Sequence, residues 1–338
     1  MTDLDTRNRA QTDPITADRL DWQIVHALQA DGRAPFSRIA DVLGISDQTV
    51  ARRYRRLRAA GVLRVLVVPN ASLLGYGQWH VRLQCTPDAS VAVATALASR
   101  PDTSWIYLTS GGTEITCTTS ARTARERNEL LLGKLPRTNR VVAVSAHAQL
   151  HTFVGGPTSL MDKLGVLTPE QVAALRPPTP PGAARGEQVK LTEEDDRLLE
   201  VLAHDGRTGY PRLAAVTGWS ESTVRRRLEH LLTTGTVYCD VDVDATILGY
   251  RAQAILWLTV APAKLAAVGT CLAEHPEIAW VAATTGTTNL AASAVCRDMD
   301  ALYEYLTACI GNLDGVRHVE TAPVIRVIKR AGSVVPGS

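Results

Sequence analysis

The sequence predicts an α+β protein in which one unit is written twice in tandem: a winged helix-turn-helix domain followed by a ferredoxin-like βαββαβ domain. Three observations lead to this prediction. The chain repeats itself at a nearly constant offset. Glycines and polar caps mark the ends of three short helices at the start of each copy, and strand-like and helix-like segments alternate in the rest of it.

The internal repeat sets the domain boundaries. Asp31-Gly32-Arg33 recurs as Asp205-Gly206-Arg207, an offset of 174 residues that becomes 175 farther along, where Gly111 matches Gly286. The predicted organisation is a flexible tail (1–17), a first winged helix-turn-helix domain (18–70), a first ferredoxin-like domain (71–156), a linker with a short helix (157–190), a second winged helix-turn-helix domain (191–245) and a second ferredoxin-like domain (246–332).

Composition places the chain among ordinary globular proteins. Hydrophobic residues make up 45% of its 338 residues and charged residues 21%, which excludes a wholly disordered or coiled-coil chain. No run of about 18 apolar residues occurs, and the polar, acid-bearing start does not fit a signal peptide. The six cysteines include no CxxC pair, so we expect a reducing cytoplasm, no disulfides and no metal site.

The first domain of each unit has the pattern of three short helices. In the first copy, apolar residues recur at helical spacing after Asp21 until Asp31-Gly32 ends the first helix. The second helix ends at Gly44, and Ser46 caps a longer third helix. This is the helix-turn-helix layout, in which the third helix reads DNA, and the β-branched run Val62 to Val68 predicts a wing strand or hairpin.

The third helix carries a cluster of arginines away from its apolar stripe. Guanidinium groups match phosphate oxygens and the guanine edge, so this helix is predicted to bind double-stranded DNA. The alternative is a solvated basic face that only keeps the surface soluble. The predicted DNA-binding residues are Ser46, Asp47, Gln48, Thr49, Arg52, Arg53, Arg55, Arg56 and Arg64 in the first copy, with Arg226 and Arg227 in the second.

The two copies differ in charge, although the whole chain has a net charge of only +2. Residues 20–70 hold eight Arg and four Asp, whereas residues 194–244 hold six Arg and ten acidic residues. Asp240, Asp242 and Asp244 in the second wing would repel phosphate. We therefore expect the second copy to bind DNA weakly, or to have become a packing or partner surface.

The second half of each unit alternates strands with helices. In the first copy a strand from Trp79 to Cys85 precedes an alanine-rich helix, two strands joined at Gly111-Gly112, a further helix and a last strand over 141–153. The order βαββαβ predicts an antiparallel sheet with both helices on one face. The other face must be covered, either by the sheet of the second copy or by another chain.

Between the copies lies a segment with its own signals. Thr168-Pro169-Glu170-Gln171 has a capping-box pattern and predicts a short helix to about Leu175. Prolines at 177, 178, 180 and 181 then predict a stiff, extended linker, with the boundary between the copies near residue 190.

Together these motifs resemble an Lrp/AsnC-type transcriptional regulator, over nearly the whole chain and twice. The resemblance implies sequence-specific binding of pseudo-palindromic DNA by paired third helices, and ferredoxin-like domains that form a homodimer or a higher oligomer. It also implies a cytoplasmic protein associated with the nucleoid. The residues that carry it are Leu20-Asp21, Asp31-Gly32-Arg33, Ile39-Ala40, Leu43-Gly44-Ile45-Ser46, Thr49-Val50, Arg53, Leu57, Gly61-Val62-Leu63 and Leu74-Gly75-Tyr76.

The resemblance further implies that an amino acid or another small effector binds at the turn between the two middle strands. Members of this family carry a glycine followed by an aspartate at that turn, whereas this chain has Glu114 in the first copy and Asn289 in the second. The alternative is that the glycines serve turn geometry alone. The candidate effector-binding residues are Gly111, Gly112, Glu114, Gly286 and Asn289.

The pattern leaves two alternative functions open, an enzyme and a partner protein that does not bind DNA. Some tandem proteins of this architecture resemble siroheme decarboxylases, enzymes that hold a tetrapyrrole with His and Arg side chains. The candidates for such a role are His80, Arg82, His147, His151 and Arg326, with Ala254 and Arg326 in the places of His80 and His151 in the second copy. No catalytic triad, P-loop or paired carboxylate is evident, so we expect no enzyme, no catalytic residue and no cofactor. The other alternative is a partner protein that does not bind DNA and co-assembles with a full regulator.

Overall fold

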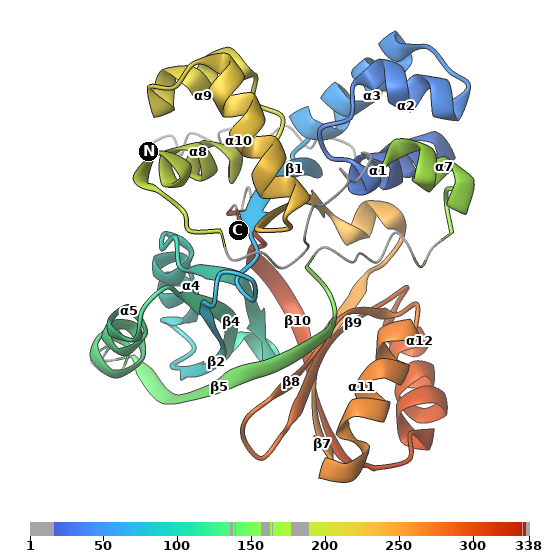
Figure 1. Ribbon diagram of the computed structural model, residues 1–338. Coiled ribbons are helices and arrows are strands. Elements are labelled where there is room, and N and C mark those ends of the chain that lie inside the picture. The colour runs from blue at the N-terminus through green and yellow to red at the C-terminus, as the bar shows by residue number, and fades with distance from the viewer. Residues whose placement is uncertain are drawn as a thin grey trace, which may run out of the picture.

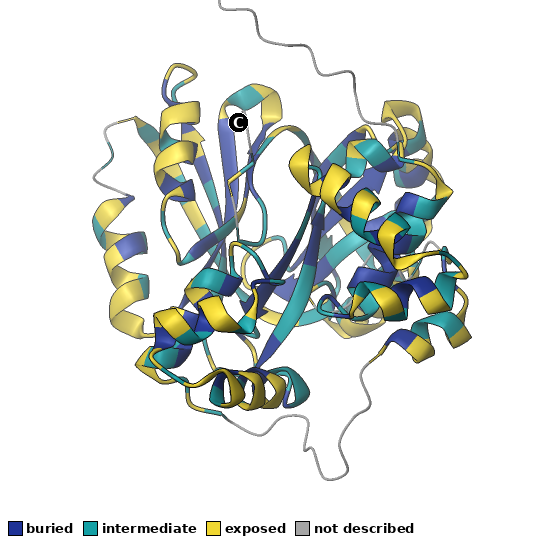
Figure 2. Ribbon diagram, turned by 90° about the horizontal axis from the view of Figure 1, so that it is seen from above, coloured by how far each residue is buried: buried dark blue, intermediate teal, exposed yellow. Residues whose placement is uncertain are grey.

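The computed structural model describes residues 17–135, 138, 140–156, 163, 165–176, 189–332 and 334–335. These residues form two layers: a pair of helix-turn-helix domains lies above a β-barrel that is flanked by helices (Figure 1). Seen from above, buried strands fill the interior and the helices turn exposed faces outward (Figure 2). Most of the predicted tail (1–17) and the proline-rich part of the predicted linker lie outside the described residues.

The first helix-turn-helix domain forms as predicted. Asp18 caps the first helix with a capping box, Gly44 ends the second in the left-handed conformation (φ 67°), and the Ser46 hydroxyl accepts a hydrogen bond from the backbone N–H of Thr49. The core contains fully buried Ile24 and Leu57, whose truncation to alanine would cost about 2–5 kcal/mol each. The elements are α1 (Arg19–Ala30), α2 (Phe36–Leu43), α3 (Asp47–Ala59) and β1 (Leu63–Pro69).

The second helix-turn-helix domain repeats this arrangement with its own core. Thr192 and Ser220 cap its first and third helices, and Gly218 ends the second helix in the left-handed conformation. The elements are α8 (Glu193–Leu202), α9 (Tyr210–Thr217), α10 (Glu221–Thr233) and β6 (Val237–Val243).

The predicted wing is neither a separate wing nor a hairpin. Instead β1 pairs antiparallel with β6, its counterpart in the other copy. Leu66 lies opposite Asp240, and these two residues occupy the same position of the repeat. The strand pair is therefore centred on a pseudo-twofold axis that relates the two helix-turn-helix domains, and each domain is the other's symmetry mate within one chain.

The two ferredoxin-like domains form one closed barrel, with strand order β10-β3-β4-β2-β5-β8-β9-β7. Each unit supplies four neighbouring strands, and its long last strand also pairs with the other unit: β5 with β8, and β10 with β3. The strands are β2 (Gly77–Cys85), β3 (Thr103–Thr109), β4 (Glu114–Ala121), β5 (Val141–Val154), β7 (Ala252–Val260), β8 (Ile278–Thr284), β9 (Leu290–Cys296) and β10 (Val316–Lys329). The sheets thus cover each other within one chain, which decides between the two coverings left open by the sequence.

Helices cover the outer face of each sheet. They are α4 (Ser90–Ala98), α5 (Ala124–Asn128) with the π-helical turn η2 (Glu129–Lys134), α11 (Leu265–Glu274), and α12 (Met299–Glu304) with the π-helical turn η5 (Tyr305–Cys309). Short 3₁₀ turns are η1 (Ser110–Gly112), η3 (Ala245–Leu248), η4 (Pro262–Lys264) and η6 (Ile310–Asn312). Because side chains alternate along a strand, Val81 and Leu83 pack toward the helices while His80 and Arg82 face the interior between the sheets.

The strand registers correct the alignment of the two copies at His80, where the sequence comparison placed Ala254. His80 pairs with Thr118 in the first unit, and Ile255 pairs with Ser293 in the second, so Ile255 rather than Ala254 takes the place of His80. The offset has already become 175 residues at the start of β2 and β7. A one-residue error in the repeat moves a side chain to the opposite face of a strand.

The predicted short helix in the linker is α7 (Pro169–Leu175), and both capping-box hydrogen bonds of Thr168 and Gln171 are present. It packs on the first helix-turn-helix domain, where Leu175 is fully buried. The guanidinium of Arg38 donates hydrogen bonds to the carbonyl oxygens of Ala174 and Arg176 at the end of this helix.

Candidate nucleic-acid interface

The outer layer of the molecule presents the two third helices, α3 and α10, on either side of the strand pair β1–β6 (Figure 1). On α3 a shallow pocket is lined by Gln48, Arg52, Arg55 and Arg56. Within the described residues, the side chains of Gln48 and Arg52 have no hydrogen-bond or ion-pair partner, and Arg55 only donates to the carbonyl oxygen of Ala51 at 3.2 Å. These donors are free to meet a ligand.

Two predicted DNA-binding arginines are instead committed to the fold. Arg53 donates to Asp18 at 2.7 Å and to Asp21 at 3.0 Å, and Arg56 donates to Asp21 at 2.5 Å. Asp21 is fully buried, so these guanidinium groups compensate its charge. The hydrogen bond from Arg53 also lowers the pKa of Asp18. Arg53 therefore ties α3 to α1, whereas Arg56 is still half-exposed beside the pocket.

The polar residues at the start of α3 form its cap. The Ser46 and Thr49 hydroxyls are 2.9 Å apart, and an Asp47 carboxylate oxygen accepts from the backbone N–H of Gln48 at 2.7 Å. Ser46 and Asp47 thus have a local structural role, while the Gln48 side chain projects without a partner.

Arg64 does not lie with the other predicted DNA-binding residues. Its neighbours Leu63 and Val65 pack in the core of the first helix-turn-helix domain, so Arg64 projects from the opposite face of β1, toward the barrel. It lies opposite Asp242, which also pairs with Arg330 at 3.2 Å. We therefore no longer expect Arg64 to contact DNA.

The acidic residues of β6 share that underside. Arg330 reaches Asp242 and, at 3.7 Å, Asp244, and burial raises the pKa of Asp240 to about 7. The expected repulsion of phosphate by these carboxylates is wrong, because they lie between the two layers of the molecule. The charge of the second DNA-facing surface is accordingly less negative than the sequence window suggests.

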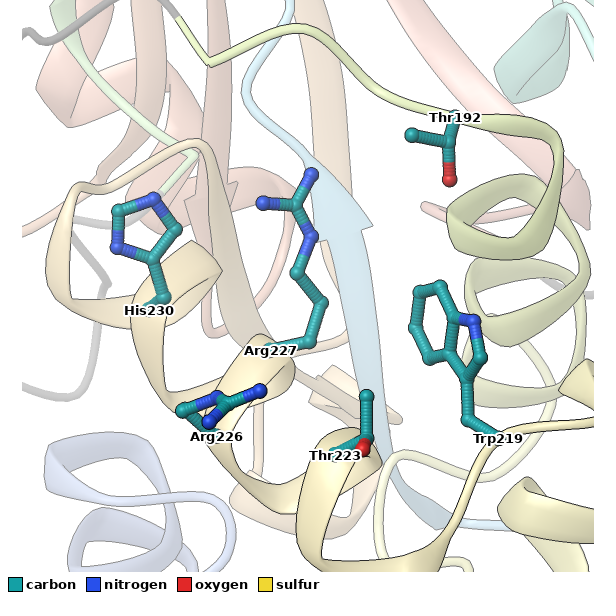
Figure 3. A pocket seen from close by; sticks show the side chains of 6 residues that line it. All are labelled: Thr192, Trp219, Thr223, Arg226, Arg227 and His230. Carbon is teal, nitrogen blue, oxygen red and sulfur yellow. The ribbon is translucent and has the colours of Figure 1, made fainter.

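The third helix of the second domain, α10, lines a pocket of different chemistry. Figure 3 shows the indole of Trp219 on one wall, with Arg226 and His230 on α10 and the hydroxyl-bearing residues Thr192 and Thr223 around it. Arg227 also borders this pocket, but its guanidinium donates to buried Asp195 at 2.7 and 2.9 Å. Arg227 thus repeats the structural role of Arg53, and Arg226 repeats the free position of Arg52.

A reciprocal clasp, missed at the sequence level, holds the two domains together. Arg33 donates to the carbonyl oxygens of Gly206 and Thr208, and Arg207 donates to those of Gly32 and Ala34 at 2.7 and 2.8 Å. The repeated Asp-Gly-Arg motif is therefore an interface motif. Its recurrence at one fixed offset was the only signal that could have revealed it.

The predicted effector turns are occupied by the protein's own side chains. Gly111 and Gly112 have φ of 73° and 83°, as the turn requires. The Glu114 carboxylate accepts from Arg82 at 2.6 Å and from Ser110 at 2.8 Å, and Arg82 continues to Glu320 of the other unit.

In the second turn, the Asn289 amide bonds both the N–H and the carbonyl oxygen of Val260. Gly286 packs so closely on the ring of His147 that an added Cβ would lie 2.3 Å from its Nδ1. These contacts favour the turn-geometry alternative for Gly286 and Asn289.

The interior between the sheets is polar on one side. His80 bonds Gln149 at 2.7 Å and Thr118 at 3.2 Å, and burial lowers its pKa to about 4. Arg82 stacks on the Trp257 ring at 4.8 Å. His147 lies opposite His80 on β5, so the structure brings His80, Arg82 and His147 onto one inner face.

Paired helix-turn-helix domains above a barrel of two ferredoxin-like domains place the chain in a helix-turn-helix class of folds. The AsnC-type helix-turn-helix domain model matches residues 18–58 and 191–232, and the Lrp/AsnC ligand binding domain model matches residues 253–334. These matches show AsnC-type helix-turn-helix domains in both copies and an Lrp/AsnC ligand binding domain in the second copy. Among the described residues, no helix combines the length and apolar character needed to cross a bilayer.

Its relatives in sequence correspond to one unit each. The HTH-type transcriptional regulator FL11 of Pyrococcus horikoshii is 29% identical over 143 residues, which are 42% of this chain and 94% of that protein. The HTH-type transcriptional regulator LrpA of the same organism is 29% identical over 140 residues, 41% of this chain and 99% of LrpA.

A solved structure matches both units together. The siroheme decarboxylase NirDL covers 95% of this chain with 95% of its own, at 16% identity and a TM-score of 0.60. At this identity the likeness shows the fold. The expectation that the chain is no enzyme is contradicted by this finding, because the two-unit architecture is also that of an enzyme. The lack of a familiar catalytic motif was therefore no ground for excluding catalysis.

Proposed function

We propose that the chain is a sequence-specific DNA-binding regulator in which one polypeptide supplies both halves of a dimer-like reader. The supporting observation is that the pseudo-twofold pairing of β1 with β6 sets α3 and α10 in equivalent positions of one layer. Helix-turn-helix dimers place such helices in successive major grooves, about 34 Å apart. A homodimer is thus no longer needed to supply the second reader.

The proposed DNA contacts are the exposed side chains that the fold leaves unpaired. Gln48, Arg52 and Arg55 extend from α3, and Arg225 and Arg226 extend from α10. Arg225 also lies 4.8 Å above the Tyr210 ring. Arginine and glutamine form bidentate hydrogen bonds with guanine and adenine, and arginine also binds phosphate. Arg53 and Arg227 support these residues from behind by fixing each third helix to the first helix of its domain.

The test is a selection of bound duplexes from a random library by the full-length chain, followed by fluorescence anisotropy on the selected sequence. We expect a sequence preference of at least about 10³ over random DNA at moderate salt. Equal binding of selected and random duplexes would refute sequence-specific reading.

A small effector at the turn between β3 and β4 is a finer part of the proposal. It is supported indirectly: the Lrp/AsnC ligand binding domain model matches the second unit, residues 253–334, in which β8 and β9 hold the repeat positions of β3 and β4. Because Arg82 already holds Glu114 and Glu320, an effector with an ammonium group has to replace Arg82 at a carboxylate. Calorimetric titration with the twenty amino acids tests this, and Glu114→Gln should weaken any binding that is found.

A second candidate function is decarboxylation of a tetrapyrrole acid, the activity named for NirDL. The observation that favours it is the inner face of the first unit, where His80, Arg82 and His147 come together. Titration of the purified protein with iron-uroporphyrin III tests it: a shifted absorption band that His147→Ala removes would support this function.

A further inference from the structure

We infer that the chain recognises a non-palindromic operator, built from two unlike half-sites, and binds it in one orientation only. This inference rests on the proposed DNA-binding function and concerns the specificity of that same surface. It follows from a symmetric scaffold that carries two readers of unequal chemistry.

The scaffold is symmetric. Leu66 faces Asp240 at the centre of the β1–β6 pair, and the Arg33 and Arg207 hydrogen bonds are repeated on either side of that centre. An added Cβ on Gly206 would lie 2.8 Å from the backbone of Leu66, so the two domains are in backbone contact. Equivalent positions of α3 and α10 therefore meet equivalent positions of two successive half-sites.

The exposed side chains at those positions differ. The two helices share a threonine (Thr49, Thr223) and a free arginine (Arg52, Arg226). Three further exposed positions are exchanged: Gln48 corresponds to Ser222, Arg55 to Glu229, and Arg56 to His230. In addition, an exposed arginine, Arg225, stands on α10 where α3 has Ala51.

These exchanges change which base edges each helix fits. Arginine and glutamine on α3 suit guanine and adenine, which offer acceptors in the major groove. On α10 the Glu229 carboxylate only accepts hydrogen bonds, so it suits the amino group of cytosine and is repelled by the groups that Arg55 would bind.

A second difference lies where the first helix of each domain meets the third. In the first domain the Asp18–Arg53 ion pair, 2.7 Å long, occupies this place, and Ile45 holds the repeat position of Trp219. In the second, Thr192 and Trp219 stand at the same repeat positions. Arg227 turns to Asp195, and the pocket of Figure 3 opens between the indole and α10. An indole wall with a threonine methyl beside it suits an apolar base substituent such as the thymine methyl group.

The combined result is one strongly basic reader that fits guanine, and a second reader in which Arg225 and Arg226 stand beside an acceptor, Glu229, and an apolar wall, Trp219. A homodimer built from either unit would instead select a palindrome. Because both readers are fixed in one polypeptide, the order of the two half-sites along the DNA is also fixed.

The experiment selects duplexes with the full-length chain and then inverts one half of the selected site at a time. We expect a motif with unlike halves, and a loss of affinity of about fivefold or more when either half is replaced by the inverted copy of the other. A palindromic motif overturns the inference, and so does a motif confined to one half-site. A chain that selects no sequence at all rejects the proposed function itself.

A gain-of-function variant supplies an independent readout. Ser222→Gln, Arg225→Ala, Glu229→Arg and His230→Arg, combined, replace four exposed residues of α10 by their counterparts on α3. We expect this variant to prefer a palindrome of the first half-site, while the control Glu274→Gln on α11, in the lower layer, keeps the wild-type motif. An unchanged motif in this combined variant, with an unchanged melting temperature, contradicts the inference.

Discussion

Arg33 and Arg207 each donate hydrogen bonds to the turn that contains the other arginine. Each guanidinium crosses the pseudo-twofold axis and donates to two carbonyl oxygens that flank the other arginine. The Arg207 guanidinium also lies 4.5 Å above the Phe36 ring. In the sequence these two arginines are visible only as part of a repeated motif. In the structure their hydrogen bonds hold the two helix-turn-helix domains together, and so set the separation of α3 and α10.

The first prediction concerns this clasp. Arg207→Ala removes two hydrogen bonds and leaves the carbonyl oxygens of Gly32 and Ala34 without these donors, so we expect a loss of about 2–3 kcal/mol in the free energy of unfolding. DNA affinity should fall as well, although Arg207 is not on the reading surface. Chemical denaturation and anisotropy measure the two effects. Arg212→Ala, an exposed change on α9, is the control and should stay within about 0.5 kcal/mol.

The second prediction separates reading arginines from structural ones. Arg52→Ala with Arg55→Ala should remove most DNA binding and flatten the dependence of log affinity on log salt by about 0.9 per lost phosphate contact. Arg225→Ala with Arg226→Ala should weaken binding less, because the exposed carboxylate of Glu229 on α10 stands where α3 has Arg55 and opposes phosphate binding. Mobility shifts at several salt concentrations measure both. Equal losses from the two helices would refute the asymmetry.

The third prediction concerns the buried carboxylate of the second domain. Asp195→Asn leaves the Arg227 guanidinium half-buried without its counter-charge, so we expect a loss of about 2–3 kcal/mol. The adjacent Asp196→Asn breaks only an ion pair with Arg122 in which both side chains are more than a third exposed, and should cost less than about 1 kcal/mol. Thermal melts of the two variants test this contrast. Comparable costs would show that burial does not set the strength of these pairs.

The fourth prediction is a pH dependence of stability. Burial lowers the pKa of His80 to about 4, whereas in the unfolded chain it returns to its ordinary value of 6.5. Between these values the unfolded state binds the proton and the folded state does not, so His80 lowers stability as the pH falls from about 6.5 to 4. The loss should approach about 3 kcal/mol. His80→Gln should flatten that part of the stability curve, and a curve identical to that of the wild type would rule out His80 as its cause.

Local signals in the sequence were enough to predict where individual helices begin and end. Gly44 and Ser46 bound the helix-turn-helix turn through a left-handed φ and a hydroxyl cap, and Thr168 with Gln171 starts α7, all by interactions among near neighbours in the chain. Interactions between near neighbours can be predicted from the order of residues alone. The internal repeat then predicts that each element occurs twice.

The sequence did not predict which side chains bind one another. Arg52 and Arg53 are neighbours of the same type on one helix, but only the packing of α3 on α1 turns Arg53 toward the buried Asp21 and leaves Arg52 outside. Likewise Arg64 and Asp242 face the barrel because β1 pairs with β6, a contact between residues far apart in the sequence. Pairing and burial depend on such long-range contacts.

Residue order thus specifies a duplicated unit of a helix-turn-helix domain and a ferredoxin-like domain, its helices and strands, and an arginine-rich third helix in the first copy. The tertiary structure alone decided that the two copies are each other's partners, that the acids of β6 lie away from the reading surface, and which arginines remain free. The physical reason is that propensity and capping act over a few residues, whereas symmetry, burial and charge compensation are properties of the assembled fold.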